Sequence, residues 1–302
     1  MKSLKVLFLL LLALNARAET FRVAAYNVEN YLDAPTESRP HVKSEAAKKK
    51  VRESILAMNP DVLALEEMGT TNALLELRDS LRADGCDFPF WEHVSGFDTN
   101  IHVAILSKLP IVARHPHGNE NYLLDGRRFH VSRGFGEVEI ETTNHFVFTL
   151  IAVHLKSRRP VPQADEAEMR LAEAKVLREI IDEKLSRNAG ARLIVLGDFN
   201  DLHNSEAIKT IIGRGKTKLT DTRPAERSGD DAPAENPRYE PRNITWTHHY
   251  GVEDTYSRVD YIFLSPAMTR VWLPEETYIP KIPNWGVGSD HRPVTAAFRV
   301  GE

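Results

Sequence analysis

Two short polar strings, each following an apolar stretch, constrain the fold of this chain most. Gly197–Asp201 (GDFND) follows the apolar run Arg192–Leu196, and Gly288–Pro293 (GSDHRP) lies close to the C-terminus. An apolar run of this kind indicates a buried strand, and the glycine after it allows a sharp turn. Carboxylates, an amide and a histidine then lie at strand ends, where a scaffold can hold them in one cleft. Such side chains suit a hard divalent cation and an activated water, which predicts an enzyme.

The first 18 residues predict a secretory signal peptide. Lys2 and Lys5 give a positive start, Val6–Leu14 is a short apolar core, and Ala16-Arg17-Ala18 is a small-x-small cleavage site. The apolar core is shorter than the ~20 residues that span a bilayer. The alternative is a buried N-terminal helix. We expect cleavage after Ala18, export to a periplasm or the medium, and no stable membrane anchor.

Composition predicts one domain after the leader, residues 19–302. No internal repeat or break in composition separates two cores, and removing Lys2, Lys5 and Arg17 takes the formal charge from −4 to −7. An acidic chain argues against a protein that coats nucleic acid with a broad basic face, but it is compatible with an enzyme that brings metal to a phosphate. Cys86 is the only cysteine, which excludes an intramolecular disulfide, so stability comes from the core.

The pattern of apolar residues predicts an α/β (α+β) sandwich of two packed sheets with helices outside. Helices are expected over 44–58, 72–81 and 166–185. Strands are expected over 21–30, 61–68, 88–94, 102–108, 136–142, 145–155, 192–196, 243–250, 257–265 and 294–300. This order fits two packed sheets better than a doubly wound parallel sheet. Residues 223–242 contain four prolines and few apolar residues, which predicts a flexible insertion.

Three acidic or amide residues near the N-terminus are candidate ligands. Asn27 follows the first strand, where an Asn ordinarily makes a turn. Glu66 and Glu67 end a buried strand. Adjacent strand residues point to opposite faces, so one of the pair can enter a given cleft and the other is a solvated strand end. This acidic pair indicates a metal ligand.

His154 ends the longest apolar strand, where a histidine is either a hydrogen-bonded core residue or a site residue. The basic segment Lys156–Arg159 follows at once and suits an anionic substrate, although a solvated turn would also explain it. Arg133 either contacts a phosphate or pairs with an acidic neighbour. These residues are candidate phosphate donors.

The strongest candidates lie in the second half of the chain. Asp198 and Asn200 are two residues apart, so on an extended chain they face the same side. Asp260 lies inside an apolar run, and a buried Asp needs a partner, for which histidine is the obvious choice. Asp290 and His291 supply a carboxylate and an imidazole. A histidine oriented by a buried Asp is a general base that works near neutral pH.

Taken together, these motifs resemble the endonuclease/exonuclease/phosphatase superfamily of deoxyribonuclease I-like, metal-dependent phosphoesterases. The resemblance covers almost the whole chain after the leader. It rests on YNVEN (26–30), PDVLALEEM (60–68), HVAILSKLPIV (102–112), AVHLKSRR (152–159), LGDFND (196–201), SRVDYIFLS (257–265) and SDHRPV (289–294). It implies a four-layered αββα sandwich of two mainly antiparallel sheets, with the active site where the sheets open at one edge.

The resemblance also implies roles for these residues. Glu67 is similar to the main Mg²⁺ or Mn²⁺ ligand, and Glu66 stands where the family often has Gln. The other metal-site residues it implies are Asn27, which also supports the phosphate, Asp198, and Asp290 as a second carboxylate.

For catalysis, the resemblance implies that His291 is the base and that Asp260 orients it. Asp198 and Asn200 would position the phosphate and nucleophile or aid the leaving group, and His154 would donate to the phosphoryl oxygens.

The expected function is metal-dependent phosphoester hydrolysis. The cofactor is Mg²⁺ or Mn²⁺, with room for a second divalent ion such as Ca²⁺. A nuclease or nucleotide phosphodiesterase is the first choice, because export and a metal site suit the scavenging of nucleic acid or phosphate. A phosphomonoesterase or a lipid phosphodiesterase of the sphingomyelinase kind uses the same chemistry, with Trp285 as a weak membrane contact. The rival of a different class is a non-catalytic secreted binding protein on the same scaffold.

Overall fold

Two β-sheets form the centre of the molecule, in a computed structural model that describes residues 18–227 and 243–301. The first sheet has the order β12 (Ala225–Glu226), β16 (Trp272–Ile279), β17 (Val294–Val300), β1 (Glu19–Tyr31), β2 (Val62–Met68), β4 (His102–Ser107) and β3 (Phe90–Val94). The second has the order β11 (Thr220–Asp221), β15 (Asp260–Leu264), β10 (Leu193–Asp198), β9 (Val147–His154), β8 (Phe135–Glu141) and β5 (Ile111–Arg114). The pairs β1–β2, β9–β10 and β12–β16 are parallel. The other strand pairs in the described residues are antiparallel, so both sheets are mainly antiparallel.

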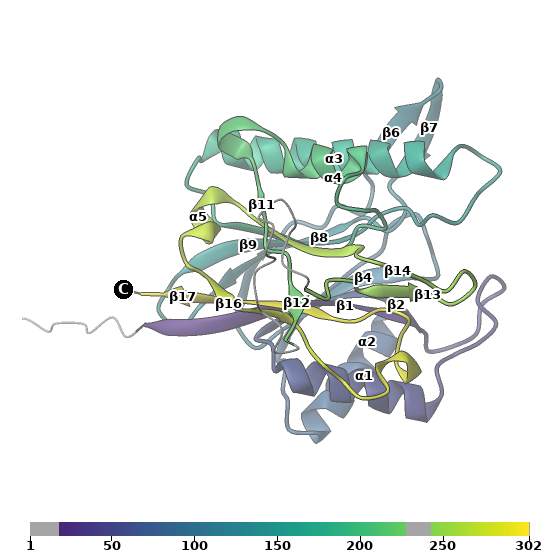
Figure 1. The fold of residues 1–302 in the computed structure, drawn as a ribbon, viewed down its shortest axis with the longest axis horizontal. Coiled ribbons are helices and arrows are strands. Elements are labelled where there is room, and N and C mark those ends of the chain that lie inside the picture. Colours follow the sequence, from purple (N-terminus) through teal and green to yellow (C-terminus); the bar gives the residue numbers. More distant parts are fainter. Residues whose placement is uncertain (1–17, 228–242, 302) are drawn as a thin grey trace, which may run out of the picture.

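Helices cover the outer face of each sheet, which gives four layers (Figure 1). Helices α1 (Glu45–Met58) and α2 (Thr71–Ala83) lie on the first sheet, and α3 (Glu166–Arg187) and α4 (Glu206–Ile212) lie on the second. The remaining elements are α5 (Pro266–Thr269), the 3₁₀ turns η1 (Gly215–Thr217) and η2 (Trp285–Val287), and the hairpins β6 (Asn121–Leu124)–β7 (Arg127–His130) and β13 (His248–Tyr250)–β14 (Thr255–Ser257). The expected αββα sandwich is confirmed.

Alternation along β1 shows why the sheets pack in this way. Val23 and Ala25 face the core between the two sheets, whereas Ala24 and Tyr26 face the core beneath α1 and α2. Because successive strand residues point to opposite faces, a strand that is apolar at every position is buried on both sides. The central strands are of this kind, and they hold their polar ends rigidly.

Local signals set the ends of the helices that the sequence predicts. Ser44 caps α1 by accepting a hydrogen bond from the backbone N of Ala47 at 3.2 Å, and Asn59 ends the helix in the left-handed conformation. Asp165 caps α3 by accepting from the backbone of the first turn. The ranges 44–58 and 166–185 therefore describe α1 and α3 to within two residues.

The prediction was less accurate at the edges of the sheets. Only the end of the expected strand 243–250 is a strand, β13, while β16, next to the two-residue edge strand β12, was not predicted. β16 contains Pro274 and exposed polar residues, and its pairing with β17 shifts register, so its pattern does not resemble a buried strand.

Two segments for which the sequence makes specific predictions fall partly or wholly outside the described residues. These are the expected leader, of which residues 1–17 are not described, and most of the expected insertion, residues 228–242. At the start of the insertion, Ala225 and Glu226 form β12 and pair with β16. In the described part of the chain, no helix is long and apolar enough to cross a membrane.

Candidate active site

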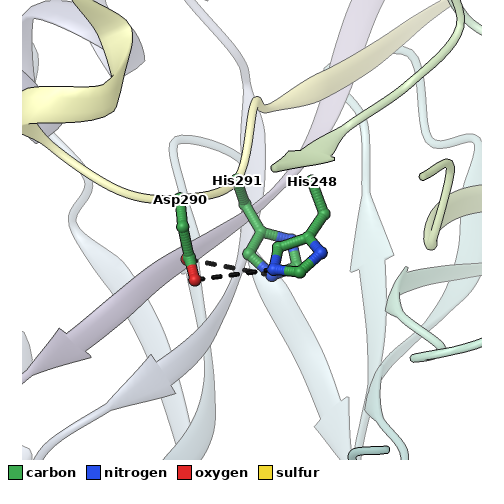
Figure 2. A group of neighbouring side chains, drawn as sticks. All are labelled: His248, Asp290 and His291. Carbon is green, nitrogen blue, oxygen red and sulfur yellow. Dashed lines mark ion pairs between the residues drawn. The ribbon is translucent and has the colours of Figure 1, made fainter. Parts of the chain in front are cut away.

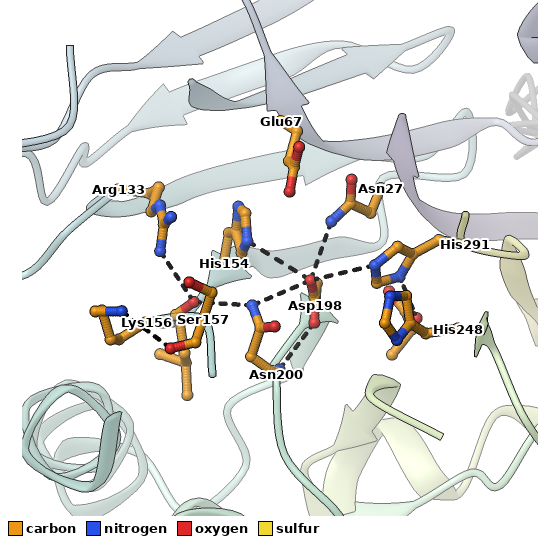
Figure 3. Close-up of polar contacts among 12 residues, drawn as sticks. Asn27, Glu67, Arg133, His154, Lys156, Ser157, Asp198, Asn200, His248 and His291 are labelled. Atoms are coloured by element: carbon orange, nitrogen blue, oxygen red, sulfur yellow. Dashed lines mark hydrogen bonds and ion pairs between the residues drawn. The ribbon is translucent and has the colours of Figure 1, made fainter. Parts of the chain in front are cut away.

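The candidate residues converge where strand ends from both sheets meet (Figure 3). In the second sheet, Asp198 at the end of β10 pairs in register with His154 of β9 and with Asp260 of β15. The first sheet supplies Asn27 from β1 and Glu67 from β2, and the segment before β17 supplies His291. Residues far apart in the sequence are thereby brought to one edge of the sandwich.

Asp198 is the centre of the cluster and is 1% exposed. Its Oδ2 accepts hydrogen bonds from Asn27 Nδ2 at 3.0 Å and Asn200 Nδ2 at 3.2 Å, and its Oδ1 accepts from the backbone N of Asn200 at 2.8 Å. The Nε2 atoms of His154 and His291 lie 3.6 Å and 3.8 Å from the same Oδ2. Burial raises the pKa of Asp198 to about 6. The structure thus brings together five of the residues that the sequence singled out.

His291 and Asp260 form a buried pair beside Asp198. His291 Nδ1 lies 2.9 Å from Asp260 Oδ2. Burial alone would lower the pKa of His291, but the carboxylates of Asp260 and Asp198 raise it well above its usual value. Ser289 fixes the loop, because its hydroxyl donates to the carbonyl of Asn27 at 2.7 Å and accepts from the backbone N of His291 at 3.0 Å. The pair leaves Nε2 as the free nitrogen of His291.

Glu67 occupies a left-handed backbone conformation, with φ of 58°. A register shift interrupts the pairing of β2 with its neighbour β4 at this point. A non-glycine residue at such φ is uncommon, and strained residues of this kind cluster at functional sites. The carboxylate accepts one hydrogen bond, from the backbone N of Asn30 at 3.0 Å, and points into the space between Asn27 and His154 (Figure 3).

Glu66 is fully buried beneath the same cluster. In the described part of the chain, neither of its carboxylate oxygens has a hydrogen-bond partner. Burial raises the pKa of Glu66 well above its usual value, and the nearby Asp260 and Asp198 raise it further. Strict alternation predicted that one of the two glutamates is a solvated strand end. The backbone turn at Glu67 breaks this alternation, and Glu66 is buried. This environment favours the protonated form of Glu66.

Arg133 and His154 form the donor side of the site. Arg133 is 6% exposed, and its Nη1 donates to the carbonyl of Leu155 at 3.3 Å. Its Nε lies 3.6 Å from Asp98 Oδ2, which is the acidic neighbour that the sequence allowed, and the side chain lies beside the site (Figure 3), so contact with a phosphate stays a prediction. Burial lowers the pKa of His154 well below its usual value, and Arg133 adds to this. Nδ1 of His154 has no hydrogen-bond partner among the described residues.

The basic segment after His154 differs from its expected role. Lys156 is buried, and its Nζ donates to the carbonyls of Ser157 at 3.0 Å and Arg159 at 2.9 Å. It therefore stabilises its own loop, as the alternative of a turn allowed. Arg158 is exposed and its Nε donates to the carbonyl of Asn200 at 3.1 Å, which places it at the rim of the site.

His248 was not predicted as a site residue, although it lies beside His291 (Figure 2). The two rings are 4.5 Å apart between centroids, and His248 Nε2 lies 3.5 Å from Asp290 Oδ2. Although burial opposes it, the imidazoles of His248 and His291 lower the pKa of Asp290. The histidine doublet His248-His249 was the available signal, because two adjacent strand residues present one ring to each face.

The donor set fits a hard divalent cation. The carboxylate of Glu29 lies near those of Asp290 and Glu67. Burial raises the pKa of Glu29, and the negative charges of Asp290 and Glu67 raise it further. Lys43, at 3.5 Å from Glu29, is a nearby cation that lowers the pKa of Glu29. Mg²⁺ and Mn²⁺ take carboxylate and amide oxygens, which Glu67, Asp290, Asp198 and Asn27 offer here.

Carboxylates, amides and histidines at the open edge of a two-sheet sandwich define a class of metal-dependent phosphoester hydrolases. The sequence profile of the Endonuclease/Exonuclease/phosphatase family matches residues 24–291, and the chain belongs to this family. The suspected resemblance is therefore confirmed, and members of the family are divalent-metal-dependent phosphoesterases. No curated protein sequence gives a significant match.

Solved structures with the same fold come from enzymes with different names. Truncated TDP2 from Caenorhabditis elegans has a TM-score of 0.61 at 16% identity and covers 93% of this chain and 98% of its own. The human Nocturnin catalytic domain with bound sulfate has a TM-score of 0.61 at 16% identity, covering 92% and 94%. Sphingomyelinase C from Streptomyces griseocarneus has a TM-score of 0.60 at 17% identity, covering 93% and 99%. Identities this low establish the shared fold.

Proposed function

We propose that this protein is an exported, Mg²⁺- or Mn²⁺-dependent phosphodiesterase of the nuclease type. The observation that carries the proposal is the buried pair of His291 Nδ1 and Asp260 Oδ2 at 2.9 Å, whose free Nε2 faces Asp198 at 3.8 Å. A histidine held in this way can remove a proton from a water beside the phosphorus atom. A purely binding scaffold has no need of this arrangement.

The metal would be held by Glu67 with Asn27, Asp290 and Asp198. When bound, it neutralises the non-bridging oxygens of the phosphate and lowers the pKa of water. Every one of these residues offers an oxygen ligand, which matches the preference of Mg²⁺ and Mn²⁺.

The protein's own residues perform the remaining steps. His291 Nε2 accepts the proton of the attacking water, while Asp260 accepts from Nδ1, holds the ring in this orientation and stabilises the imidazolium that forms. Asn200, held against Asp198, orients the phosphate. His154 and Arg133 place donors and positive charge where negative charge spreads over the phosphoryl oxygens in the transition state.

A nucleic acid or nucleotide is the substrate class we favour. Arg158, tied to the carbonyl of Asn200, puts an exposed cation at the rim of the site, where a second phosphate of a polymer would lie. A lipid substrate has weaker support. Trp285, the candidate membrane contact, is half-buried and packs on Trp246 with ring centroids 5.5 Å apart, so its ring is less available to a membrane. Export suits scavenging of such polymers.

Turnover tests the proposal directly. Bis-p-nitrophenyl phosphate, p-nitrophenyl phosphate, linear DNA and sphingomyelin vesicles are each incubated with Mg²⁺, with Mn²⁺ and with EDTA. His291→Ala is compared with His115→Ala, which removes an exposed histidine. We expect metal-dependent cleavage of the diester and of DNA, which His291→Ala lowers by about 10²–10⁴-fold.

The other outcomes separate the alternatives. Cleavage of the monoester alone identifies a phosphomonoesterase, and cleavage of sphingomyelin alone identifies a lipid phosphodiesterase. A His291→Ala variant with near-native rates overturns the assignment of the base. No metal-dependent turnover on any of the four substrates overturns the proposal in favour of a binding protein.

A further inference from the structure

A second imidazole with no part in the mechanism lies on the outer side of the catalytic histidine. His248 Nε2 is 3.5 Å from Asp290 Oδ2, and His291 Nε2 is 4.0 Å from Asp290 Oδ1. All three potential ligand atoms lie within 4.8 Å of one another. Figure 2 shows the Asp290 carboxylate facing both imidazoles.

Backbone hydrogen bonds hold the three residues in place. His248 and His291 form an antiparallel bridge. On either side of it, the backbone N of His249 donates to the carbonyl of Asp290 at 3.0 Å, and the backbone N of Arg292 donates to Thr247 at 2.6 Å. Two chain segments are thus clamped together, and ligands on rigid segments keep their geometry.

We propose that His248, Asp290 and His291 form a second metal site, specific for a borderline transition-metal ion such as Zn²⁺. Two imidazole nitrogens and one carboxylate match the ligands of Zn²⁺, whereas Mg²⁺ takes oxygen ligands. Zn–N bonds of about 2.0–2.1 Å place neighbouring ligand atoms of a tetrahedron roughly 3.3 Å apart. Small rotations of the half-buried His248 and Asp290 side chains reach that separation from the distances above.

Occupancy of this site inhibits the reaction, a consequence that rests on the proposed function. His291 Nδ1 is already paired with Asp260, so Nε2 is the one nitrogen that can take the proton of water. An ion on Nε2 occupies its lone pair and removes the base. Zn²⁺ therefore competes with catalysis through His291. It also takes Asp290 from the proposed Mg²⁺ ligands, while Glu67 stays free.

Direct binding of Zn²⁺ tests the site without relying on activity. Wild-type protein, His248→Ala, His248→Gln, Asp290→Asn and His249→Ala compete for Zn²⁺ with a chromophoric chelator in excess Mg²⁺, and circular dichroism verifies that each is folded. His249→Ala is the matched control, because it removes the adjacent ring, whose Nε2 pairs with Asp254 at 3.2 Å. We expect both His248 variants and Asp290→Asn to bind Zn²⁺ at least about 10–100-fold more weakly, and His249→Ala to bind it like wild type.

Inhibition is then measured on the diester with Mg²⁺. The Zn²⁺ concentration for half-inhibition should rise in His248→Ala by the same factor as the binding constant. Equal Zn²⁺ affinity in wild type and both His248 variants overturns the inference, as does equal weakening by His249→Ala. Zn²⁺ binding that depends on His248 in a protein without Mg²⁺-dependent turnover overturns the proposed function and leaves the metal site standing.

Discussion

Glu66 and Glu67 are neighbours in sequence, yet the structure places their carboxylates in different environments. Glu67 turns out of the strand with a left-handed backbone and offers its carboxylate to the site. Glu66 is buried under Asp198 and Asp260 with no hydrogen-bond partner in the described residues. A buried carboxylate without a partner is stable only when it keeps its proton.

Replacing Glu66 with Gln should therefore stabilise the protein above neutral pH. The folded-state pKa of Glu66 is raised, so folded protein binds this proton more tightly than unfolded protein. Wild-type stability then falls as pH rises from the ordinary glutamate range towards the folded pKa, by up to about 1.4 kcal/mol per pH unit. Because glutamine does not titrate, the stability of Glu66→Gln does not fall with pH at this position.

Chemical denaturation in EDTA at pH 4 and pH 8 measures the effect. The variant should gain on the order of 1 kcal/mol or more over wild type at pH 8, and the gain should shrink at pH 4. Glu253→Gln, at an exposed turn, is the control and should change stability by less than about 0.5 kcal/mol. A Glu66→Gln variant less stable than wild type at pH 8 contradicts the neutral acid.

Asp260→Asn should lower turnover and move its pH dependence. The rate rises with pH as His291 loses its proton, and against the effect of burial the Asp260 carboxylate raises the pKa of that histidine. Without the charge, the acid limb of the kcat/KM profile moves to lower pH, while loss of ring orientation lowers kcat on the order of 10²-fold or more. Asp254→Asn, at an exposed position, is the comparison. If the acid limb of Asp260→Asn stays where it is in wild type, a group other than His291 controls the pH dependence.

Most of the site could be predicted from the sequence, because its residues lie at or next to the ends of apolar strands. Asp198 ends β10, whereas Asp260 begins the apolar strand β15 and His291 lies just before β17, and the structure brings the three together. His248 could not be found in this way, because its position depends on a bridge to His291, 43 residues further along the chain, that no local pattern records. The contacts of Lys156 are likewise not visible in the sequence, because the carbonyls of Ser157 and Arg159 lie within reach of its Nζ only in the folded loop.

At the scale of elements, Gly197 allows β10 to pass close to its neighbours. A Cβ at this position would lie 2.1 Å from the carbonyl oxygen of Val153 in β9 and 2.8 Å from Glu66 Oε1 in the other sheet. Its φ of 133° is also in the region that side chains rarely adopt. The sequence predicted a turn at this glycine, but Gly197 lies inside β10 and is paired on both sides, so its role is in packing.

Gly197→Ala should destabilise the protein by about 2–4 kcal/mol, the combined cost of overpacking and backbone strain. It should also lower activity, because Asp198 is the next residue in β10. The matched control is Gly286→Ala, where an added Cβ meets nothing within 4 Å and φ is ordinary. Urea unfolding of both variants measures the difference. Equal stability of the two variants would mean that β10 moves freely to accept a side chain.

Elements in the middle of the sheets were easier to predict than those at the edges. β10 is buried at every position and β17 at every position but Arg299, and burial on both faces indicates a central strand. β16, which only the two-residue strand β12 separates from the edge, is mostly half-buried or exposed, so its residues carry no such constraint. The short helix α4 was also missed, although Ser205 caps it, because seven residues give too few turns for a helical period.

For the whole molecule, the start of the fold coincides with the expected end of the leader. β1 begins at Glu19, the residue after the expected cleavage site, and pairs there with Val300 at the other end of the chain. The Glu19 carboxylate accepts hydrogen bonds from Thr143 and Asn144, so Glu19 is anchored to a loop of the other sheet. A chain beginning at Glu19 retains every contact named here.

Export should therefore yield a protein that starts at Glu19 and is fully stable without the leader. Expression of the full chain in a bacterial host, followed by intact-mass measurement of the periplasmic fraction and medium, should show loss of residues 1–18. Ala18→Glu places a charged residue at the small-x-small site and should block cleavage. A chain expressed from Glu19 should unfold at the same temperature as the uncleaved Ala18→Glu chain, because the strands and helices of the described residues all begin at or after Glu19. Uncleaved protein confined to the cytoplasm would overturn the export, and a lower unfolding temperature of the shortened chain would show that the first 18 residues belong to the fold.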